Sequence, residues 1–156
     1  MGPMRTAVVD WGDEYERHRA DLLRRAYLLL GDVASAEDAV HAVFERVAGS
    51  TAGVERPAAY LHRAVNNEAT SVLRRRSMMR RRRRVLEIDE SVSPERVVEF
   101  ADAMRALTER QRVAVVMRVL DRASDEDICA ALGCRPGTAR SLVSRGLERL
   151  REELER

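Results

Sequence analysis

The feature that most restricts the fold of this chain is a helical repeat of apolar residues, interrupted at short intervals by glycine, proline and capping residues. In the stretch "LGCRPGTARSLVSRG", Gly133 ends one apolar run and Pro136 opens the next after a short turn. Glycine is favoured just beyond a helix C-terminus, and proline at the first position of a helix. Two helices joined in this way form a helix-turn-helix. The pattern predicts such a unit near the C-terminus.

The same periodicity extends over most of the 156 residues, and aromatic residues make up only 4% of them. Strand-like alternation of apolar and polar residues is rare, so we expect an all-α protein. Pairs of residues typical of helix N-termini support several of the starts: Ser35 with Asp38, Thr108 with Gln111, and Ser124 with Asp127. The expected helices are one ending at Leu30, then 35–47, 57–76, 94–107, 109–121, 125–132 and 136–155.

Charge is strongly segregated along the chain, although the net charge is only +2. Residues 60–84 contain nine arginines and one acidic residue, whereas residues 85–109 contain seven acidic residues and two arginines. Apolar periodicity is lost at about the same place, over 77–93. We therefore expect two small helical domains, 10–76 and 94–156, joined by a flexible linker over 77–93 and without a shared core.

Several classes of protein are disfavoured. No apolar run approaches the ~18 residues that span a bilayer, so we expect no membrane insertion and a cytoplasmic location. Cys129 and Cys134 lack the spacing of a zinc site. His18, His41 and His62 fall on three separate predicted helices without a catalytic constellation. We expect no enzyme, no metal and no cofactor.

The second helix of the predicted helix-turn-helix is amphipathic. Its expected buried side consists of Ala139, Val143, Gly146, Leu147, Leu150 and Leu154. Arginines and small serines occupy the opposite side, which suits the major groove of DNA. A solvated charged face without a ligand is the alternative interpretation.

Here the chain resembles a known family. The segment Ala106–Leu154, "ALTERQRVAVVMRVLDRASDEDICAALGCRPGTARSLVSRGLERLREEL", is similar to the fourth domain of extracytoplasmic-function (ECF) sigma factors. Leu22–Phe44 looks like the opening of the second domain of that family, and Arg56–Arg76 resembles its promoter-melting helix. Both domains occur in the order found in the family, and they cover almost the whole chain.

The resemblance implies a promoter-specificity subunit of bacterial RNA polymerase. Its partners would be core RNA polymerase, through the clamp and the flap, and promoter DNA in double- and single-stranded form. The N-terminal domain would recognise and melt the minus-10 element, and the C-terminal domain would bind the minus-35 element. The loop "AGSTAGVERP" would capture an unstacked base, and the linker would enter the RNA channel. An anti-sigma factor, if one exists, would cover the polymerase-facing surfaces.

The resemblance also implies site residues. The minus-35 contacts would be Arg135, Thr138, Arg140, Ser141, Ser144 and Arg145. The minus-10 contacts would be Arg63, Asn66, Asn67, Thr70 and Arg74, on the exposed side of a helix that buries Leu61, Val65, Ala69 and Val72. The polymerase contacts would be Glu37, Asp38, His41 and Glu45.

The sequence departs from the family pattern at some of these places. The departures are Thr108 for proline, Arg140 for lysine, Leu142 for arginine, His41 and Ala42 for a glutamine-glutamate pair, and Asn66 and Ser71 for arginine and aspartate. Two alternatives stay open: a helix-turn-helix repressor or activator that acts without core polymerase, and a polymerase-binding adaptor that no longer melts promoters. The run Arg80–Arg84 is expected to attract phosphates without sequence preference.

Overall fold

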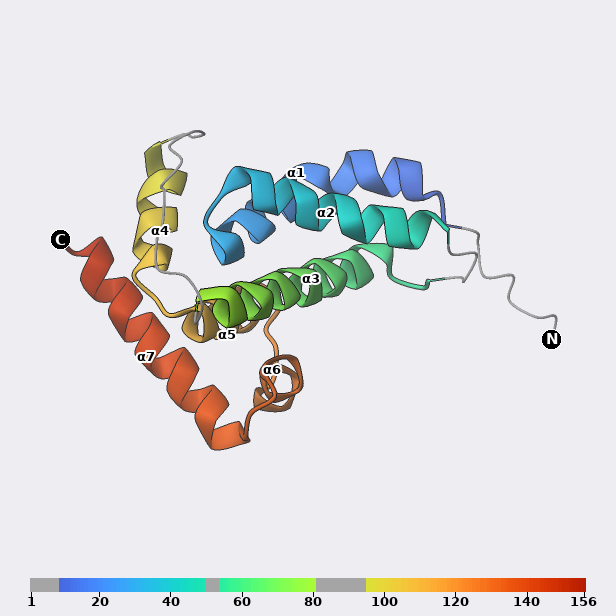
Figure 1. Cartoon of the computed structure of the whole chain (residues 1–156). Helices are drawn as coiled ribbons and strands as arrows, with labels where there is room; N and C mark the ends of the chain where they lie inside the picture. Colours follow the sequence, from blue (N-terminus) through green and yellow to red (C-terminus); the bar gives the residue numbers. More distant parts are fainter. Residues whose placement is uncertain (1–8, 50–53, 81–94) are drawn as a thin grey trace.

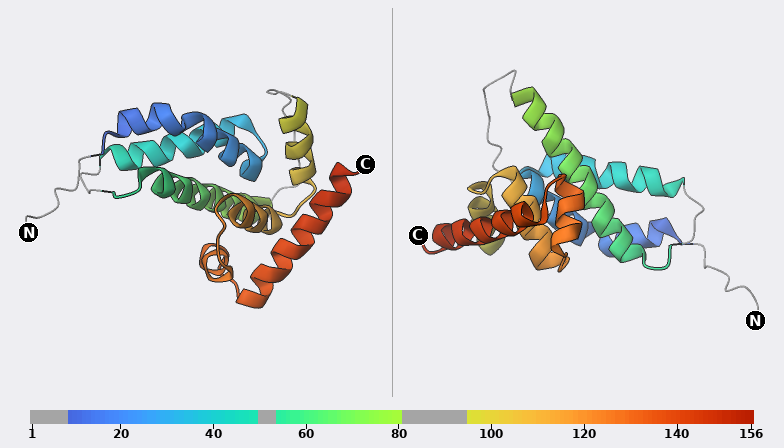
Figure 2. Two further views of the ribbon diagram at one scale, coloured as in Figure 1. Left: turned by 180° about the vertical axis from the view of Figure 1, so that it is seen from behind. Right: turned by 90° about the horizontal axis from the view of Figure 1, so that it is seen from below.

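The computed structural model describes residues 9–49, 54–80 and 95–156, and every regular element in them is an α-helix, as expected for an all-α chain. The helices are α1 (Trp11–Leu30), α2 (Val33–Ala48), α3 (Pro57–Arg80), α4 (Glu95–Arg105), α5 (Glu109–Leu120), α6 (Asp125–Leu132) and α7 (Pro136–Leu154). In Figures 1 and 2, α1, α2 and α3 lie along one another, and α4 to α7 gather around α3 and the end of α1.

The first three helices pack around an apolar core. Tyr15 on α1 packs edge-on against Phe44 on α2, with ring centroids 4.7 Å apart. Asp10 caps α1 by accepting hydrogen bonds from the backbone of its first turn, and Gly31 ends it in the left-handed conformation, with φ of 83°. The buried side chains of this cluster are Leu22, Ala26, Ala36, Val40, Val43, Phe44, Val47, Leu61 and Val65.

The start of α2 differs from the expectation. The capping pair of Ser35 with Asp38 is wrong, because α2 begins at Val33 and its N-cap is Asp32. The Asp32 carboxylate accepts a hydrogen bond from the Ser35 backbone at 2.8 Å and one from Arg76 at 2.9 Å. Burial alone would raise the pKa of Asp32, but the hydrogen bonds from Ser35 and the charge of Arg76 lower it below its ordinary value. The turn residues Gly31 and Asp32 therefore end one helix and start the next.

The helix-turn-helix forms as the sequence predicts. Thr108 and Ser124 each make a complete capping box, with Gln111 and Asp127 respectively. Gly133 adopts the left-handed conformation after α6, with φ of 58°, and α7 follows with proline in its first turn. These local devices fix where α5, α6 and α7 begin and end.

The contact between α7 and α5 is close because of Gly146. A Cβ atom at this position would lie only 2.6 Å from Cγ2 of Val115. The buried residues of α7 are Ala139, Val143, Gly146 and Leu150. Leu147 and Leu154 were expected on this side but are exposed, because they lie beside the narrow stripe that faces α5.

The expectation of two separate cores is wrong. One apolar cluster combines Leu28, Leu29 and Leu30 of α1 with Ala69 and Leu73 of α3 and with residues of the C-terminal helices. The C-terminal contributors are Ala101, Ala103, Met104, Leu107, Val113, Val115, Val116 and Leu150. The two parts of the chain thus share a continuous core.

The linker boundary also moves. Its first residues, Ser77–Arg80, belong to α3, so the basic start of the linker extends the preceding helix. Residues 81–94, and with them most of the arginine run and the acidic segment, lie outside the described residues, as do residues 50–53 of the loop before α3.

Candidate nucleic-acid and polymerase interfaces

The polar side of α7 forms one continuous exposed surface. We call it the α7 surface; it consists of Arg135, Thr138, Arg140, Ser141, Ser144 and Arg145. All six residues are exposed, while the opposite side of the helix is buried against α5 and α6. A helix that packs on its own domain along one side can insert its opposite, exposed side into a major groove of DNA. This placement agrees with the side expected from the sequence.

One arginine of the α7 surface is paired within the protein. Arg140 Nε donates to Asp125 Oδ2 at 3.0 Å, and Asp125 also accepts from Arg118. The Arg140 side chain is still 74% exposed. Exposed ion pairs contribute little, about 0–1 kcal/mol, so a phosphate or a base edge can compete for this guanidinium.

The predicted minus-10 residues do not all lie on an exposed side of α3. We call Arg63, Asn66, Asn67, Thr70 and Arg74 the α3 surface. Arg63, Asn67 and Arg74 are exposed, but Asn66 is only 5% and Thr70 only 7% exposed. The expectation that Asn66 and Thr70 face solvent is therefore wrong: α5 and α6 cover them.

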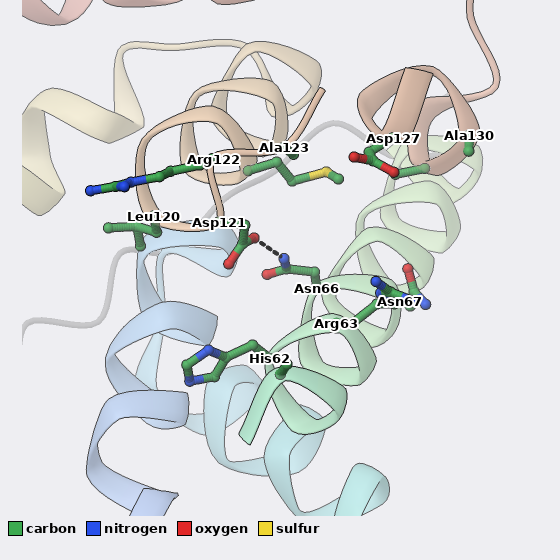
Figure 3. A pocket seen from close by; sticks show the side chains of 13 residues that line it. His62, Arg63, Asn66, Asn67, Leu120, Asp121, Arg122, Ala123, Asp127 and Ala130 are labelled. Carbon is green, nitrogen blue, oxygen red and sulfur yellow. Dashed lines mark hydrogen bonds between the residues drawn. The ribbon is translucent and has the colours of Figure 1, made fainter. Parts of the chain in front are cut away.

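A polar cluster holds this contact together. Asn66 Nδ2 donates to Asp121 Oδ2 at 2.6 Å, as Figure 3 shows, and Arg25 Nη1 donates to Asp121 Oδ1 at 2.6 Å. Arg25 Nη1 also donates to Asn66 Oδ1, at 3.4 Å. We call Arg25, Asn66 and Asp121 the Asp121 cluster. Because Arg25 is only 5% exposed, its charge depends on Asp121 for compensation.

A cavity of about 630 Å³ opens beside this cluster, between α3 and the α5–α6 connection. In Figure 3, His62, Arg63 and Asn67 line one wall and Leu120, Arg122 and Asp127 the other. Burial and the nearby charge of Arg25 lower the pKa of His62, against the opposing charges of Asp21 and Asp121.

Two further arginines bridge the parts of the chain. Arg74 Nη2 of the α3 surface donates to the carbonyl oxygen of Ala131 on α6 at 2.8 Å. Arg105 at the end of α4 donates to the carbonyl of Gly31 at 3.1 Å and lies 3.3 Å from the hydroxyl of Tyr27. The C-terminal part of the chain thus contacts the α3 surface at the buried Asn66 and at the exposed Arg74, and Arg105 adds a contact with α1 and the turn after it.

The polar side of α2 makes no such contact with the described residues of the C-terminal part. We call Glu37, Asp38, His41 and Glu45 the α2 surface, and all four residues are exposed. His41 Nε2 lies 3.1 Å from Glu45 Oε1 one turn later. The other side of α2 is core, so this acidic strip is available to a partner.

Sequence reasoning missed Arg25 and Asp121, whose contacts join residues more than 40 positions apart in the sequence. One indication was present: Arg25 falls between Leu22 and Leu29 on the apolar side of the first helix. A charged residue at such a position needs a partner.

Within the described ranges, no group of three or more His, Cys, Asp or Glu residues is arranged to hold a metal ion. Nor does any helix there combine the length and apolarity that a membrane span requires.

Comparisons with known proteins assign both parts of the chain. Residues 14–79 match the family "Sigma-70 region 2", and residues 98–150 match "Sigma-70, region 4". These segments contain the α2 and α3 surfaces and the α7 surface, respectively.

Two curated relatives are RNA polymerase sigma factors. The chain is 38% identical over 152 residues to the RNA polymerase sigma-E factor of Streptomyces avermitilis, covering 92% of this chain and 84% of that protein. It is 34% identical over 157 residues to the sigma-E factor of Streptomyces coelicolor, covering 91% and 85%.

Among solved structures, the chain is similar to the sigma factor RpoE of Bartonella quintana in complex with the anti-sigma factor NepR. The TM-score is 0.70 at 26% identity, over 94% of this chain and 97% of that one. It shares the fold of the extracytoplasmic-function sigma factor SigJ of Mycobacterium tuberculosis, with a TM-score of 0.62 at 23% identity, over 89% of this chain and 52% of that one. This chain belongs to the ECF sigma factors, which direct core RNA polymerase to promoter DNA.

Proposed function

We propose that the α7 surface contacts the minus-35 element in the major groove. The supporting observation is that all six of its residues are exposed on the same helix whose other side is buried. Arg140 is placed in the N-terminal half of α7 between short side chains, which allows close approach to base edges. Arginine forms bidentate hydrogen bonds with guanine. Arg145, one turn later, is the candidate for a phosphate contact.

We further propose that the α3 surface serves the minus-10 element. Arg63, Asn67 and Arg74 are exposed and offer amide and guanidinium donors to bases and phosphates. Asn66 and Thr70 would join them only after α5 and α6 have moved away from α3. Promoter melting by this helix therefore requires an opening of the two parts of the chain, 10–76 and 94–156, which we propose as the functional domains.

The α2 surface is the proposed contact with the polymerase clamp. Its carboxylates project from a helix whose other side is buried, so they can pair with a basic partner surface without disturbing the core. An anti-sigma factor that occupies the same polymerase-facing surfaces is a further proposed partner. We also propose that the protein acts in the cytoplasm and catalyses no reaction itself.

The test is to form holoenzymes with Arg140→Ala and Arg145→Ala and to assay them on a panel of minus-35 variants at several salt concentrations. If Arg140 contacts a base, its loss should weaken binding by about 1–3 kcal/mol and relax the preference at one base pair. If Arg145 contacts phosphate, its loss should weaken binding to all sequences and lower the salt slope by about one. Wild-type selectivity and salt dependence in both variants would refute the assignment of α7.

A further inference from the structure

The two cysteines of the chain meet at the turn of the helix-turn-helix. Cys129 lies near the end of α6, and Cys134 follows the left-handed Gly133. The backbone N–H of Cys134 donates to the carbonyl of Cys129 at 3.2 Å. This bond spans six residues, as the outer hydrogen bond of a Schellman motif does. This bond brings the side chains to the same side of the turn, and their sulfur atoms are 3.9 Å apart.

Both thiols are free and partly exposed. They lie at the edge of the small apolar cluster of Ile128, Ala139 and Val143. An apolar contact often accompanies this type of helix end, and cysteine can supply it as a small hydrophobic residue. Unlike a pair of aliphatic side chains, two partly exposed thiols at this separation can be oxidised to a disulfide.

We propose that Cys129 and Cys134 form a redox-active thiol pair, whose reversible oxidation to an intramolecular disulfide alters the helix-turn-helix. The sulfur atoms must approach from 3.9 Å to about 2.0 Å, which requires a shift of the turn or of both side chains. The bond would close a loop of only a few residues, and so short a loop gains little from restricting the unfolded chain. The disulfide should therefore be reducible by cellular thiols.

The oxidant is a low-molecular-weight disulfide. The Cys134 thiolate attacks one of its sulfurs, forming a mixed disulfide with Cys134 and releasing one small thiolate. The Cys129 thiolate then attacks the Cys134 sulfur, forming the protein disulfide and releasing the second small thiolate. Two electrons pass to the oxidant, and the two thiol protons pass to the released thiolates.

The order of these steps follows from the surroundings of Cys129. Desolvation, the contact with Cys134 and the charges of Asp125 and Glu126 raise the pKa of Cys129 above its ordinary value. A thiol with a raised pKa is a poor first nucleophile for an external disulfide. Once Cys134 carries the mixed disulfide, the closeness of Cys129 favours its attack.

The functional consequence rests on the proposed role of the α7 surface. Cys134 directly precedes Arg135, the N-cap of α7, and Thr138 follows in the first turn. Pulling Cys134 toward α6 moves the start of the α7 surface relative to the rest of the domain. Oxidation should therefore weaken binding to the minus-35 element by about tenfold, the equivalent of one lost base contact.

The experiment uses the full chain equilibrated with oxidised or reduced glutathione, then alkylated and digested with trypsin. Because Arg135 is followed by proline, the peptide 123–140 contains both cysteines and reports the disulfide directly. We expect oxidised glutathione to give an unalkylated peptide whose mass is that of the free dithiol peptide less two hydrogens, whereas the reduced sample gives the peptide with two alkyl groups; dithiothreitol added before alkylation should restore the alkylated form. The disulfide should be absent from Cys129→Ser, from Cys134→Ser and from the double variant. A test of whether the fold survives the loss of each thiol is given by Cys129→Ala and Cys134→Ala.

Binding of the holoenzyme to promoter DNA is measured on the same samples. A folded protein whose cysteines stay fully alkylatable, or that forms only cross-linked dimers, would overturn the thiol pair. A peptide disulfide with unchanged promoter binding would overturn its regulatory consequence, provided that Arg140→Ala still relaxes minus-35 preference. If Arg140→Ala has no effect either, the proposed role of α7 fails, while formation of the disulfide still supports the thiol pair.

Discussion

Asn66 on α3 and Asp121 after α5 are joined by a hydrogen bond of 2.6 Å, which connects the proposed minus-10 helix to the helices proposed to bind the minus-35 element. Arg25 completes the arrangement by donating to the same carboxylate at 2.6 Å. The side chain of Asn66, which is proposed to contact DNA, thus has its hydrogen-bond partners inside the protein. The same residue cannot serve both partners at once, so the proposed contact of Asn66 with the minus-10 element would require this hydrogen bond to break.

Loss of Asp121 should loosen this closure. In Asp121→Ala, the guanidinium of Arg25 stays buried without its counter-charge, so we expect the free energy of unfolding to fall by about 1–3 kcal/mol. Hydrogen exchange of the segment 60–74, followed by mass spectrometry, should become faster. Glu16→Ala removes an exposed carboxylate elsewhere on α1 and serves as the control. Equal stability and equal exchange in both variants would mean that the Asp121 cluster does not hold the domains together.

The sequence predicts the helices better than their contacts, for a physical reason. Thr108, Ser124 and Gly133 act within one turn of backbone, so their effect is visible in a few neighbouring letters. Asp32 acts in the same local way: its carboxylate caps α2 within one turn, three residues before Ser35, the cap that the sequence pattern predicts.

The exposed and buried sides of α3 could not be predicted in this way. Asn66 and Thr70 are polar, and a single helix gives no reason to bury them. Their burial depends on α5 and α6, which are distant in sequence. Asp121 and Arg25 satisfy the amide of Asn66, whereas the Thr70 hydroxyl donates to the backbone carbonyl of Asn66 one turn earlier in α3. By contrast, the exposure of all six residues of the α7 surface was predicted correctly, because α7 has one apolar stripe and the neighbouring helices α5 and α6 cover it.

Gly146 permits the close approach of α7 to α5, so Gly146→Ala should destabilise the protein. Alanine is favoured over glycine in a helix by about 1 kcal/mol, but a Cβ 2.6 Å from Val115 Cγ2 forces a shift that costs about 1–3 kcal/mol. We expect a net loss in the free energy of unfolding measured in urea. Gly137→Ala, in the same helix with nothing within 4 Å, should stabilise instead. In a Val115→Ala background, where the clashing methyl is absent, Gly146→Ala should destabilise less than it does in the wild type.

Asp32 should make stability depend on acid pH. Its pKa is lowered in the folded protein, so its contribution is fully present above the unfolded value, about pH 4, and is lost as the pH falls through the folded pKa. Asp32→Ala removes the N-cap of α2 and should cost about 1 kcal/mol at neutral pH. Asp32→Asn keeps a capping oxygen but no charge, so it should cost less and flatten the profile below pH 4. Thermal unfolding from pH 2 to 7 measures both effects.

Charge reversal on the α2 surface should affect the polymerase rather than the fold. Asp38 is exposed, and α2 buries only its other side, so Asp38→Arg should leave helicity by circular dichroism unchanged. Its affinity for core polymerase should fall, mainly through slower association and with strong dependence on salt. Glu16→Arg is the matched reversal on α1, away from the α2 surface. If both variants bind core polymerase like the wild type, the clamp assignment is wrong.

The pair of Asp125 with Arg140 gives the last prediction. Asp125 holds Arg140 at 3.0 Å and is itself only partly exposed, so Asp125→Asn should free this guanidinium for DNA. The neighbouring Glu126→Gln removes the same charge from the same turn, so both variants should bind all promoters more tightly through the general electrostatic term. Only Asp125→Asn should also sharpen the preference at the base pair that Arg140 contacts, and Arg140→Ala should abolish that gain. Holoenzyme affinities on the minus-35 panel distinguish the two effects. Identical preferences for Asp125→Asn and Glu126→Gln would show that the ion pair places no restraint on base contact by Arg140.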